Sequence, residues 1–331
     1  MNSTYRKAKE ILEKNDITLN GNKPWDVQIH NKNVFNRWFS EGSMGMGESY
    51  MDGWWDAKEL DKCIYKLYYE NLEKHVSIKG FWKEILKAKL MNRQTKKKSH
   101  KVAKEHYDLG NDFYENMLDS RMQYTCGYWK KAKTLEQAQK DKLDLVCKKL
   151  KLKKGEKVLE IGCGWGGFAK YAAENYGVEV TCYNISKEQV EYARKNTKGL
   201  PVTVHLADYR EAKGEYDKVA AIGIAEHVGY KNYKGMMKIA HRCLKKHGLF
   251  IVHTIANNFS TTRSEPWFDT YIFPNGMLPS AKQLAEALEG IFVLEDWHNF
   301  GPDYDKTLMA WFTNFNKNWP KFQKRYGDRF Y

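Results

Sequence analysis

A glycine-rich loop directly after a short apolar run constrains the fold of this chain more than any other feature. The run Val158–Ile161 is followed by a loop from Gly162 to Gly167, and an apolar, helix-like segment from Phe168 to Tyr176 comes next. Because glycine has no Cβ, it permits a sharp turn and the close approach of a ligand. A loop of this kind at the carboxyl end of a first β-strand predicts a nucleotide-binding α/β domain.

Two ligands compete for this loop. Gly162, Gly164 and Gly167 fit the G-x-G-x-x-G fingerprint of dinucleotide-binding proteins. With Gly166 in place of the last glycine and Glu160 before the loop, the same stretch fits the G-x-G-x-G loop of S-adenosylmethionine (SAM) methyltransferases. A dinucleotide site requires an acidic residue about 20 positions further on, and the next expected strand does not end in one. SAM is therefore favoured, and a tight turn without a ligand stays open as a third interpretation.

Apolar strands alternate with helical patterns from Thr134 onward. This alternation predicts a mainly parallel sheet covered by helices on both faces. We expect an α/β fold with the seven-stranded, Rossmann-like sheet of class I SAM methyltransferases. The expected strands are residues 157–161, 178–183, 202–206, 218–224, 249–255, 291–297 and 307–315.

The first part of the chain has no nucleotide loop and is expected to form a smaller, mainly helical N-terminal domain at residues 1–91. Its segment Phe81–Leu90 repeats apolar residues at helical spacing with lysines between them. This amphipathic helix either docks on its own domain or lies on anionic lipid. Residues 92–104 are interpreted as a basic linker, and residues 105–331 as the SAM-dependent catalytic domain.

The charge balance points to an anionic partner. Lys and Arg total 55 against 41 Asp and Glu, a net charge of +14. A basic surface of this kind suits an anionic membrane or nucleic acid, or simply keeps a protein soluble. No RNA- or DNA-binding motif is recognisable, so nucleic acid is not an expected partner. The polar N-terminus and the lack of a long apolar run predict a cytoplasmic protein that touches the membrane peripherally.

The six cysteines are scattered, without a C-x-x-C pair or a His/Cys cluster. This spacing argues against a disulfide framework and against a zinc site, and no metal is expected.

Parallel strands bring their carboxyl ends to one edge of a sheet, where ligands bind. Glu226 follows the fourth expected strand and is either an acid or base, or a solvated loop carboxylate. His253 interrupts the fifth strand and is either functional or a core histidine with a partner. Asp208 and Tyr209 follow the third strand, where methyltransferases commonly place an adenine-contacting pair. Gln189 is either part of a capping box or a ribose ligand.

Motifs spread along nearly the whole chain resemble the cyclopropane-fatty-acyl-phospholipid synthase family. The stretch Gly47–Trp55 resembles the bacterial phospholipid branch of that family. The motifs that carry the resemblance are His106–Tyr114, Gln123–Trp129, Val158–Gly167, Ala225–Gly229, His253–Ile255, Tyr271–Gly276 and Glu295–Gly301.

Together, the loop, the strand ends and the resemblance imply one set of residues for SAM and another for a bicarbonate ion. Asn184 stands where the family commonly has threonine. The expected SAM-binding residues are Tyr124, Thr125, Glu160, Gly162, Gly164, Gly166, Asn184, Ile185, Gln189, Asp208 and Tyr209. The bicarbonate site that the resemblance implies comprises Cys126, Glu226, His253, Ile255 and Tyr304, with Cys126 and Ile255 acting through their backbones.

The activity that the resemblance implies is methyl transfer from SAM to a cis double bond of an unsaturated phospholipid acyl chain. Bicarbonate-assisted deprotonation then closes a cyclopropane ring. The alternative is a SAM-dependent C-methyltransferase that acts on another lipid or small molecule without ring closure. We expect the protein to associate peripherally with the inner face of an anionic membrane. The oligomeric state considered is a homodimer.

Overall fold

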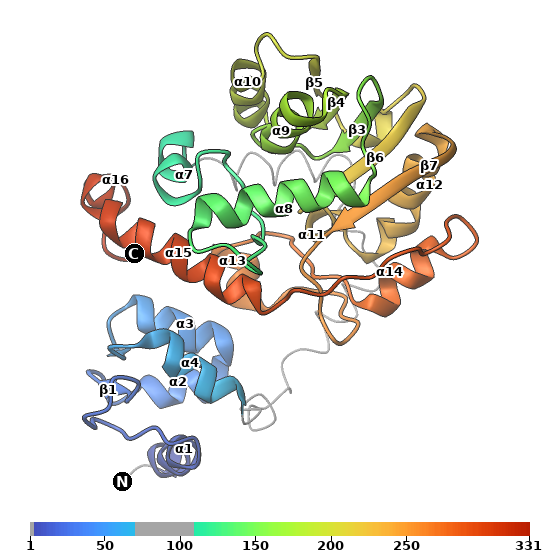
Figure 1. The fold of residues 1–331 in the computed structure, drawn as a ribbon. Coiled ribbons are helices and arrows are strands. Elements are labelled where there is room, and N and C mark those ends of the chain that lie inside the picture. Colours follow the sequence, from blue (N-terminus) through green and yellow to red (C-terminus); the bar gives the residue numbers. More distant parts are fainter. Residues whose placement is uncertain (1–2, 70–108) are drawn as a thin grey trace. The chain divides into compact units, whose positions relative to one another are not determined.

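The computed structural model describes residues 3–69 and 109–331, which form two compact units (Figure 1). One unit contains residues 3–69 together with Glu265–Ile272 and Phe322–Tyr331, and the other contains residues 109–264 together with Phe273–Lys321. The expected Phe81–Leu90 helix, the basic linker at 92–104 and the first residues of the His106 motif lie outside the described residues. The expected domain boundary therefore stays a prediction.

The larger unit is built on a parallel sheet with the strand order β5-β4-β3-β6-β7. All neighbouring strands in this sheet run parallel, in keeping with the expected α/β class. The strands are β3 Lys157–Ile161, β4 Glu179–Asn184, β5 Val202–Leu206, β6 Tyr216–Ile222 and β7 Leu244–His253.

Helices cover both faces of this sheet because successive strand residues point to opposite sides. Val158 joins the apolar core formed with α8, α9 and α10, whereas its neighbour Leu159 joins the core formed with α12. The helices are α7 Asn111–Met117, α8 Leu135–Lys149, α9 Gly167–Tyr176, α10 Lys187–Asn196, α11 Ala225–Val228, α12 Tyr233–Cys243, α14 Ala281–Leu288 and α15 Asp303–Asn318. The short 3-10 helices are η2 Tyr209–Glu211, η3 Tyr230–Asn232 and η4 Trp319–Lys321.

Two helices that position the site begin at side-chain caps. The Thr134 hydroxyl accepts a hydrogen bond from the backbone N–H of Gln137 at the start of α8. The Ser186 hydroxyl accepts one from the N–H of Gln189 at the start of α10. Such caps satisfy backbone donors that have no partner inside the helix. The residues Thr134 and Ser186 therefore determine where the two helices begin.

The sheet has five strands in the described residues, not the seven expected. Residues 307–315 lie within α15, which buries Thr307 and Trp311 one helical turn apart and has Asp303 and Asp305 in its first turn. Acidic residues at a helix start are stabilised by the helix dipole. Residues 291–297 form no strand, and Val293 there is 87% exposed. The prediction of strands at residues 291–297 and 307–315 is therefore wrong: the second segment is helical, and the first is irregular.

The smaller unit is mainly helical, as expected for the N-terminal region. Its aromatic core packs Trp38 edge-on against Trp55 and Phe35. Its helices are α1 Ser3–Lys14, α2 Val34–Glu41, α3 Ser43–Met51, α4 Leu60–Tyr69, α13 Pro266–Tyr271 and α16 Gln323–Tyr326, and β1 Gln28–Ile29 pairs with β2 Trp55–Asp56 in an antiparallel ribbon.

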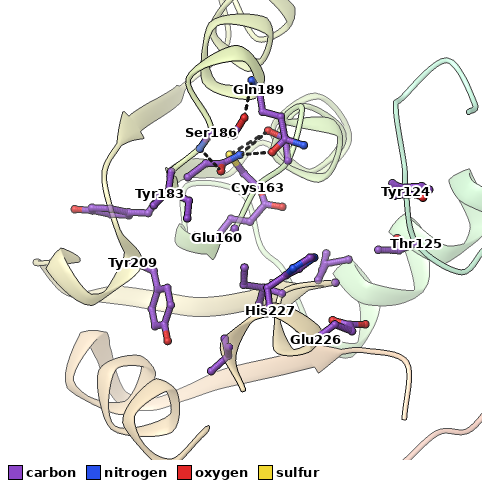
Figure 2. Close-up of a pocket in the computed structure, with 18 of the residues that line it drawn as sticks. Tyr124, Thr125, Glu160, Cys163, Tyr183, Ser186, Gln189, Tyr209, Glu226 and His227 are labelled. Atoms are coloured by element: carbon purple, nitrogen blue, oxygen red, sulfur yellow. Dashed lines mark hydrogen bonds between the residues drawn. The ribbon is translucent and has the colours of Figure 1, made fainter. Parts of the chain in front are cut away.

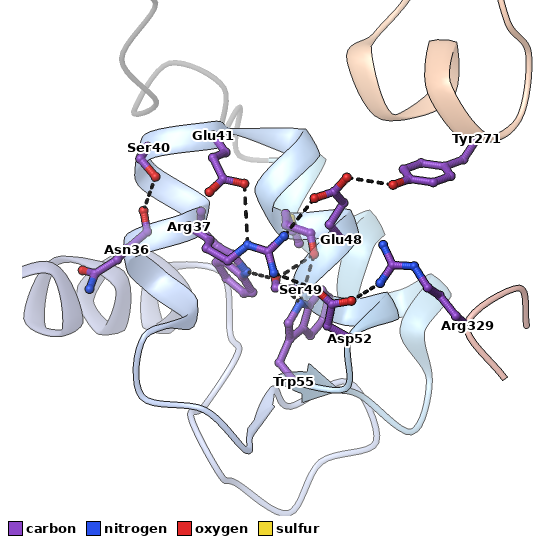
Figure 3. A network of polar contacts seen from close by, with 12 residues as sticks. Asn36, Arg37, Ser40, Glu41, Glu48, Ser49, Asp52, Trp55, Tyr271 and Arg329 are labelled. Carbon is purple, nitrogen blue, oxygen red and sulfur yellow. Dashed lines mark hydrogen bonds and ion pairs between the residues drawn. The ribbon is translucent and has the colours of Figure 1, made fainter.

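A polar network explains why α13 and the C-terminal segment belong to this unit (Figure 3). Arg37 contacts Glu48 at 2.9 Å and Asp52 at 2.8 Å. Tyr271 of α13 donates a hydrogen bond to Glu48 at 2.7 Å, and Arg329 pairs with Asp52. A hydrogen bond from α13 and an ion pair from the C-terminal segment therefore connect these distant parts of the sequence to α3 and the residue that follows it.

None of the helices in residues 3–69 and 109–331 combines the length and the apolar character that a bilayer crossing requires.

Candidate active site

A cavity in the larger unit opens at the carboxyl ends of β3, β4, β6 and β7 (Figure 2). All the predicted site residues except Gly166 line this one cavity. They are Tyr124, Thr125, Cys126, Glu160, Gly162, Gly164, Asn184, Ile185, Gln189, Asp208, Tyr209, Glu226, His253, Ile255 and Tyr304.

Three glycines of the loop after β3 have left-handed backbones, but they serve different purposes. A Cβ on Gly162 would lie 2.7 Å from the side chain of Ile224, so a neighbouring loop occupies that space. A Cβ on Gly164 would meet no protein atom within 4 Å, which leaves that side of the loop open. A Cβ on Gly166 would lie 3.0 Å from Ala193 on α10. The structure therefore gives Gly166 a packing position outside the cavity.

Asn184, the last residue of β4, connects the glycine loop to α10. Its side-chain amide donates to the Gly164 carbonyl at 3.1 Å and to Gln189 Oε1 at 3.0 Å. Its side-chain oxygen accepts from the Ser186 N–H at 3.1 Å. The Gln189 N–H donates to the Ser186 cap, but the Gln189 side chain bonds Asn184 instead of closing a capping box, and it also lines the cavity. The Ser186 cap and the interpretation of Gln189 as a ribose ligand are compatible.

The acidic and aromatic pair after β5 is buried at the cavity wall. Asp208 is 2% exposed, and its carboxylate holds the Arg210 guanidinium through two contacts of 2.8 Å. This pairing fixes the loop that carries Tyr209. Burial raises the pKa of Tyr209 to about 12, so its phenol stays neutral and can donate a hydrogen bond.

Glu160 and a lysine that the sequence analysis did not identify are buried together. Burial raises the pKa of Glu160 to about 7, against a lowering by the charge of Lys142. Lys142 is fully buried on α8. It lies between Ala138 and Val146, which are also buried, at a spacing of four residues. A lysine in the middle of an apolar i, i+4 stripe is the signal that marks it.

Glu226 and His253 each have a buried polar atom without a hydrogen-bond partner among the described residues. One Glu226 oxygen accepts from the Ile255 N–H at 2.7 Å, and the other, Oε2, has none. Nδ1 of His253 is also without one. Burial raises the pKa of Glu226 and lowers the pKa of His253 to about 3. Buried polar atoms normally have partners, so these two atoms indicate a polar ligand.

The remaining wall is aromatic. Tyr124 stacks with Phe273 at a ring distance of 5.8 Å, and Tyr304 lies edge-on to Trp311 at 6.0 Å. Burial raises the pKa of Tyr304 well above its usual range. Burial also raises the pKa of Cys126 to about 11, so its thiol is neutral and is not an activated nucleophile.

The sequence analysis also missed His227, which lines the cavity beside Phe273 at a ring distance of 5.4 Å. Burial lowers the pKa of His227 to about 4. The sequence signal was its position directly after Glu226, at the same strand end. The described residues contain no group of His, Cys, Asp and Glu side chains that could hold a metal ion.

Comparisons with known proteins identify the family. The model of the mycolic acid cyclopropane synthetase family matches residues 94–331. The chain belongs to this family. The match covers all the described residues of the cavity-bearing unit, and it confirms the resemblance that was based on the sequence motifs.

Curated relatives of this chain cover it to different extents. The cyclopropane-fatty-acyl-phospholipid synthase of Escherichia coli (strain K12) is 47% identical over 329 residues, which cover 98% of this chain and 86% of that protein. Cyclopropane mycolic acid synthase 1 of Mycobacterium tuberculosis is 33% identical over 225 residues, 62% of this chain and 78% of that protein.

Solved structures agree on the fold. A mycolic acid cyclopropane synthase crystallised with SAH and CTAB has a TM-score of 0.64 and 30% identity, and the match covers 68% of this chain and 86% of that one. A cyclopropane synthase from Mycobacterium tuberculosis has a TM-score of 0.65 and 27% identity, over 70% of this chain and 88% of that one. These neighbours and the parallel sheet confirm the class I SAM-methyltransferase fold.

Proposed function

We propose that this chain is a cyclopropane-fatty-acyl-phospholipid synthase: it transfers the methyl group of SAM to a cis double bond of a phospholipid acyl chain and closes a cyclopropane ring. The observation that carries this proposal is one cavity that joins the glycine loop after β3 to the unpartnered atoms of Glu226 and His253. The 47% identity to the Escherichia coli enzyme over 98% of the chain supports the same activity.

The glycine loop and its neighbours suit SAM, which when bound supplies a methyl group activated by a sulfonium charge. The open side of Gly164 leaves room for close approach of a ligand to the backbone. The Glu160 carboxylate lines the cavity and attracts a cation when ionised. Gln189 and the neutral Tyr209 offer hydrogen-bonding groups for the nucleoside.

The aromatic wall suits a reaction that passes through a carbocation on the acyl chain. An unactivated alkene is a weak nucleophile, so the cavity must hold the double bond in line with the methyl group. Tyr124, Phe273 and Tyr304 line the cavity, and aromatic rings of this kind can stabilise positive charge. The same rings exclude water, which would otherwise trap the cation before the ring closes.

The residues at the far end of the cavity suit a bicarbonate ion, which when bound would supply a base for the proton that leaves the new methyl group. The unpartnered atoms of Glu226 and His253 and the neutral phenol of Tyr304 are the groups that would hold it. The Ile255 N–H already donates to Glu226, so Ile255 orients that carboxyl. Because the Cys126 thiol is neutral, the proposed role of Cys126 is a contact from its backbone to the bicarbonate ion.

We also propose that the protein works at the inner face of an anionic membrane, as a cytoplasmic and peripherally bound enzyme. The net charge of +14 supports attraction to such a surface. A homodimer is the proposed assembly, and sedimentation of the purified protein tests it.

The test of the activity uses purified protein, SAM and vesicles of phospholipid with either cis-unsaturated or saturated acyl chains. We expect SAH release and a gain of one CH₂ per acyl chain only with the unsaturated lipid. Methylation that leaves the double bond intact would instead favour the alternative, a C-methyltransferase without ring closure. SAH release that does not depend on the double bond would contradict the proposal.

A further inference from the structure

A buried cluster on α8 lies behind the cavity wall and takes no part in the chemistry described above. The Lys142 ammonium donates to Gln123 Oε1 and to Thr125 Oγ1, each at 2.7 Å. Gln139, one turn earlier and also fully buried, donates to the carbonyl oxygens of the same two residues at 3.3 and 2.7 Å. Two side chains on one face of α8 therefore hold both residues through their backbones and their side chains.

Tyr124 lies between the two residues that are held. Gln123, Tyr124 and Thr125 all line the cavity, and they belong to no helix or strand that would fix them. The Tyr124 ring forms part of the aromatic wall and stacks on Phe273 with an interplanar angle of 13°. The ring also packs against Tyr114 and Trp311, and the Gln123 N–H donates to Asp119 at 2.8 Å. The bonds from α8 act together with these contacts to position the ring.

Making these bonds with a charged residue costs free energy, because a buried ammonium loses its hydration. Burial lowers the pKa of Lys142 to about 8, and the opposite charges of Asp119 and Glu160 and the nearby Cys126 raise it. The same charge reaches His253 on β7, whose pKa it lowers further. Glu160 is an acidic residue of the cavity lining whose pKa this charge lowers.

We propose that Lys142, together with Gln139, is a positioning residue of the active site that holds Gln123–Thr125 so that Tyr124 forms the wall against which SAM binds. Its charge also stabilises the Glu160 carboxylate that faces the cationic co-substrate. The inference rests on the proposed function in one respect, that SAM occupies this cavity.

The test compares three variants with the wild-type protein by calorimetric titration with SAM from pH 6 to pH 9. Lys142→Met removes the donor and the charge, whereas Lys142→Gln keeps a donor without the charge. Lys140→Met is the matched control, because Lys140 is an exposed lysine on the same helix. We expect Lys142→Met to weaken SAM binding by about tenfold or more, Lys142→Gln to lie between, and Lys140→Met to bind as the wild type does.

The pH dependence separates the charge from a purely structural effect. Removing a nearby positive charge raises the pKa of a carboxyl group, so the acid-side loss of SAM affinity should move up by about 1 pH unit in both Lys142 variants. In steady-state assays KM for SAM should rise more than kcat falls. A structural role alone would lower affinity at every pH and leave this midpoint unchanged.

Thermal unfolding identifies any variant that does not fold. If Lys142→Met does not fold, the SAM affinity of Lys142→Gln is used for the test instead. Folded Lys142 variants with wild-type SAM affinity and midpoint would overturn the inference while the proposed function stands. A wild-type protein that does not bind SAM would overturn the proposed function, and this inference with it.

Discussion

A methyl group added at Gly164 tests the SAM site with little disturbance elsewhere. Gly164 has φ +52, and a Cβ there would meet no protein atom within 4 Å, although the residue lines the cavity. Gly199 has φ +85 and equally open surroundings, but it does not line the cavity. The variants Gly164→Ala and Gly199→Ala therefore share the strain of an alanine in the left-handed region, and only the first places a methyl group in the proposed SAM site.

The magnitudes follow from this comparison. Left-handed backbone costs about 1–2 kcal/mol for a residue with a Cβ, so both variants should unfold a few degrees below the wild type, at about 2–4 °C per kcal/mol. A methyl group forced against a ligand costs about 1–3 kcal/mol. Gly164→Ala should therefore bind SAM about 5- to 150-fold more weakly, and Gly199→Ala should bind it normally. Gly164→Val, with a branched side chain, should bind more weakly still.

Calorimetric titration with SAM and thermal unfolding of the same samples measure the two effects separately. Equal SAM affinity in folded Gly164→Ala and Gly199→Ala would refute the assignment of the loop to SAM. A loss of affinity in both variants would show that backbone strain, not occupied space, explains the effect.

Three further predictions concern the acid-base groups and the membrane. His253→Ala should lower the rate about a hundredfold or more, Cys126→Ser should lower it only mildly, and Glu226→Gln should have an intermediate effect. In carbonate-depleted buffer the wild-type rate should fall, and it should return when bicarbonate is added. A rate that depletion does not change would exclude the ion. Burial lowers the pKa of His227 to about 4, so between about pH 6.5 and 4 the unfolded chain binds a proton at this residue and the folded chain does not. The free energy of unfolding should therefore fall as the pH falls through this range. His227→Gln should lose less stability over the same range, and an equal loss would contradict the burial argument. Binding to anionic vesicles should weaken as salt rises, and co-sedimentation that ignores salt and lipid charge would count against membrane attraction.

The sequence predicted the cavity because two simple rules place its residues. Parallel strands end at one edge, so residues such as Glu226 and His253, far apart in the chain, were expected together. Glycine marks a sharp turn in the sequence itself, and Gly162 and Gly164 have left-handed backbones and line the cavity. β3 and β5 have the expected bounds, whereas β4, β6 and β7 differ from theirs by a few residues, chiefly at β7, which begins at Leu244.

What the sequence did not predict depends on tertiary partners. Residues 307–315 are rich in apolar side chains, and only the buried spacing of Thr307 and Trp311 reveals the helix α15. Lys142 resembles the exposed lysines of α8 until Gln123 and Thr125 are seen to accept its hydrogen bonds. The association of α13 with the N-terminal helices depends on long-range contacts, among them the hydrogen bond between Tyr271 and Glu48, which are 223 residues apart.

Ring closure is the central claim, and SAM with a fully deuterated methyl group tests it most directly. The purified protein is incubated with this SAM and vesicles of cis-unsaturated phospholipid, and the acyl chains are then analysed by mass spectrometry. If the methyl group is transferred and then deprotonated to close a ring, each product chain retains two of the three deuterons and no longer has a double bond. A product that retains all three deuterons, or one that keeps its double bond, would contradict the account.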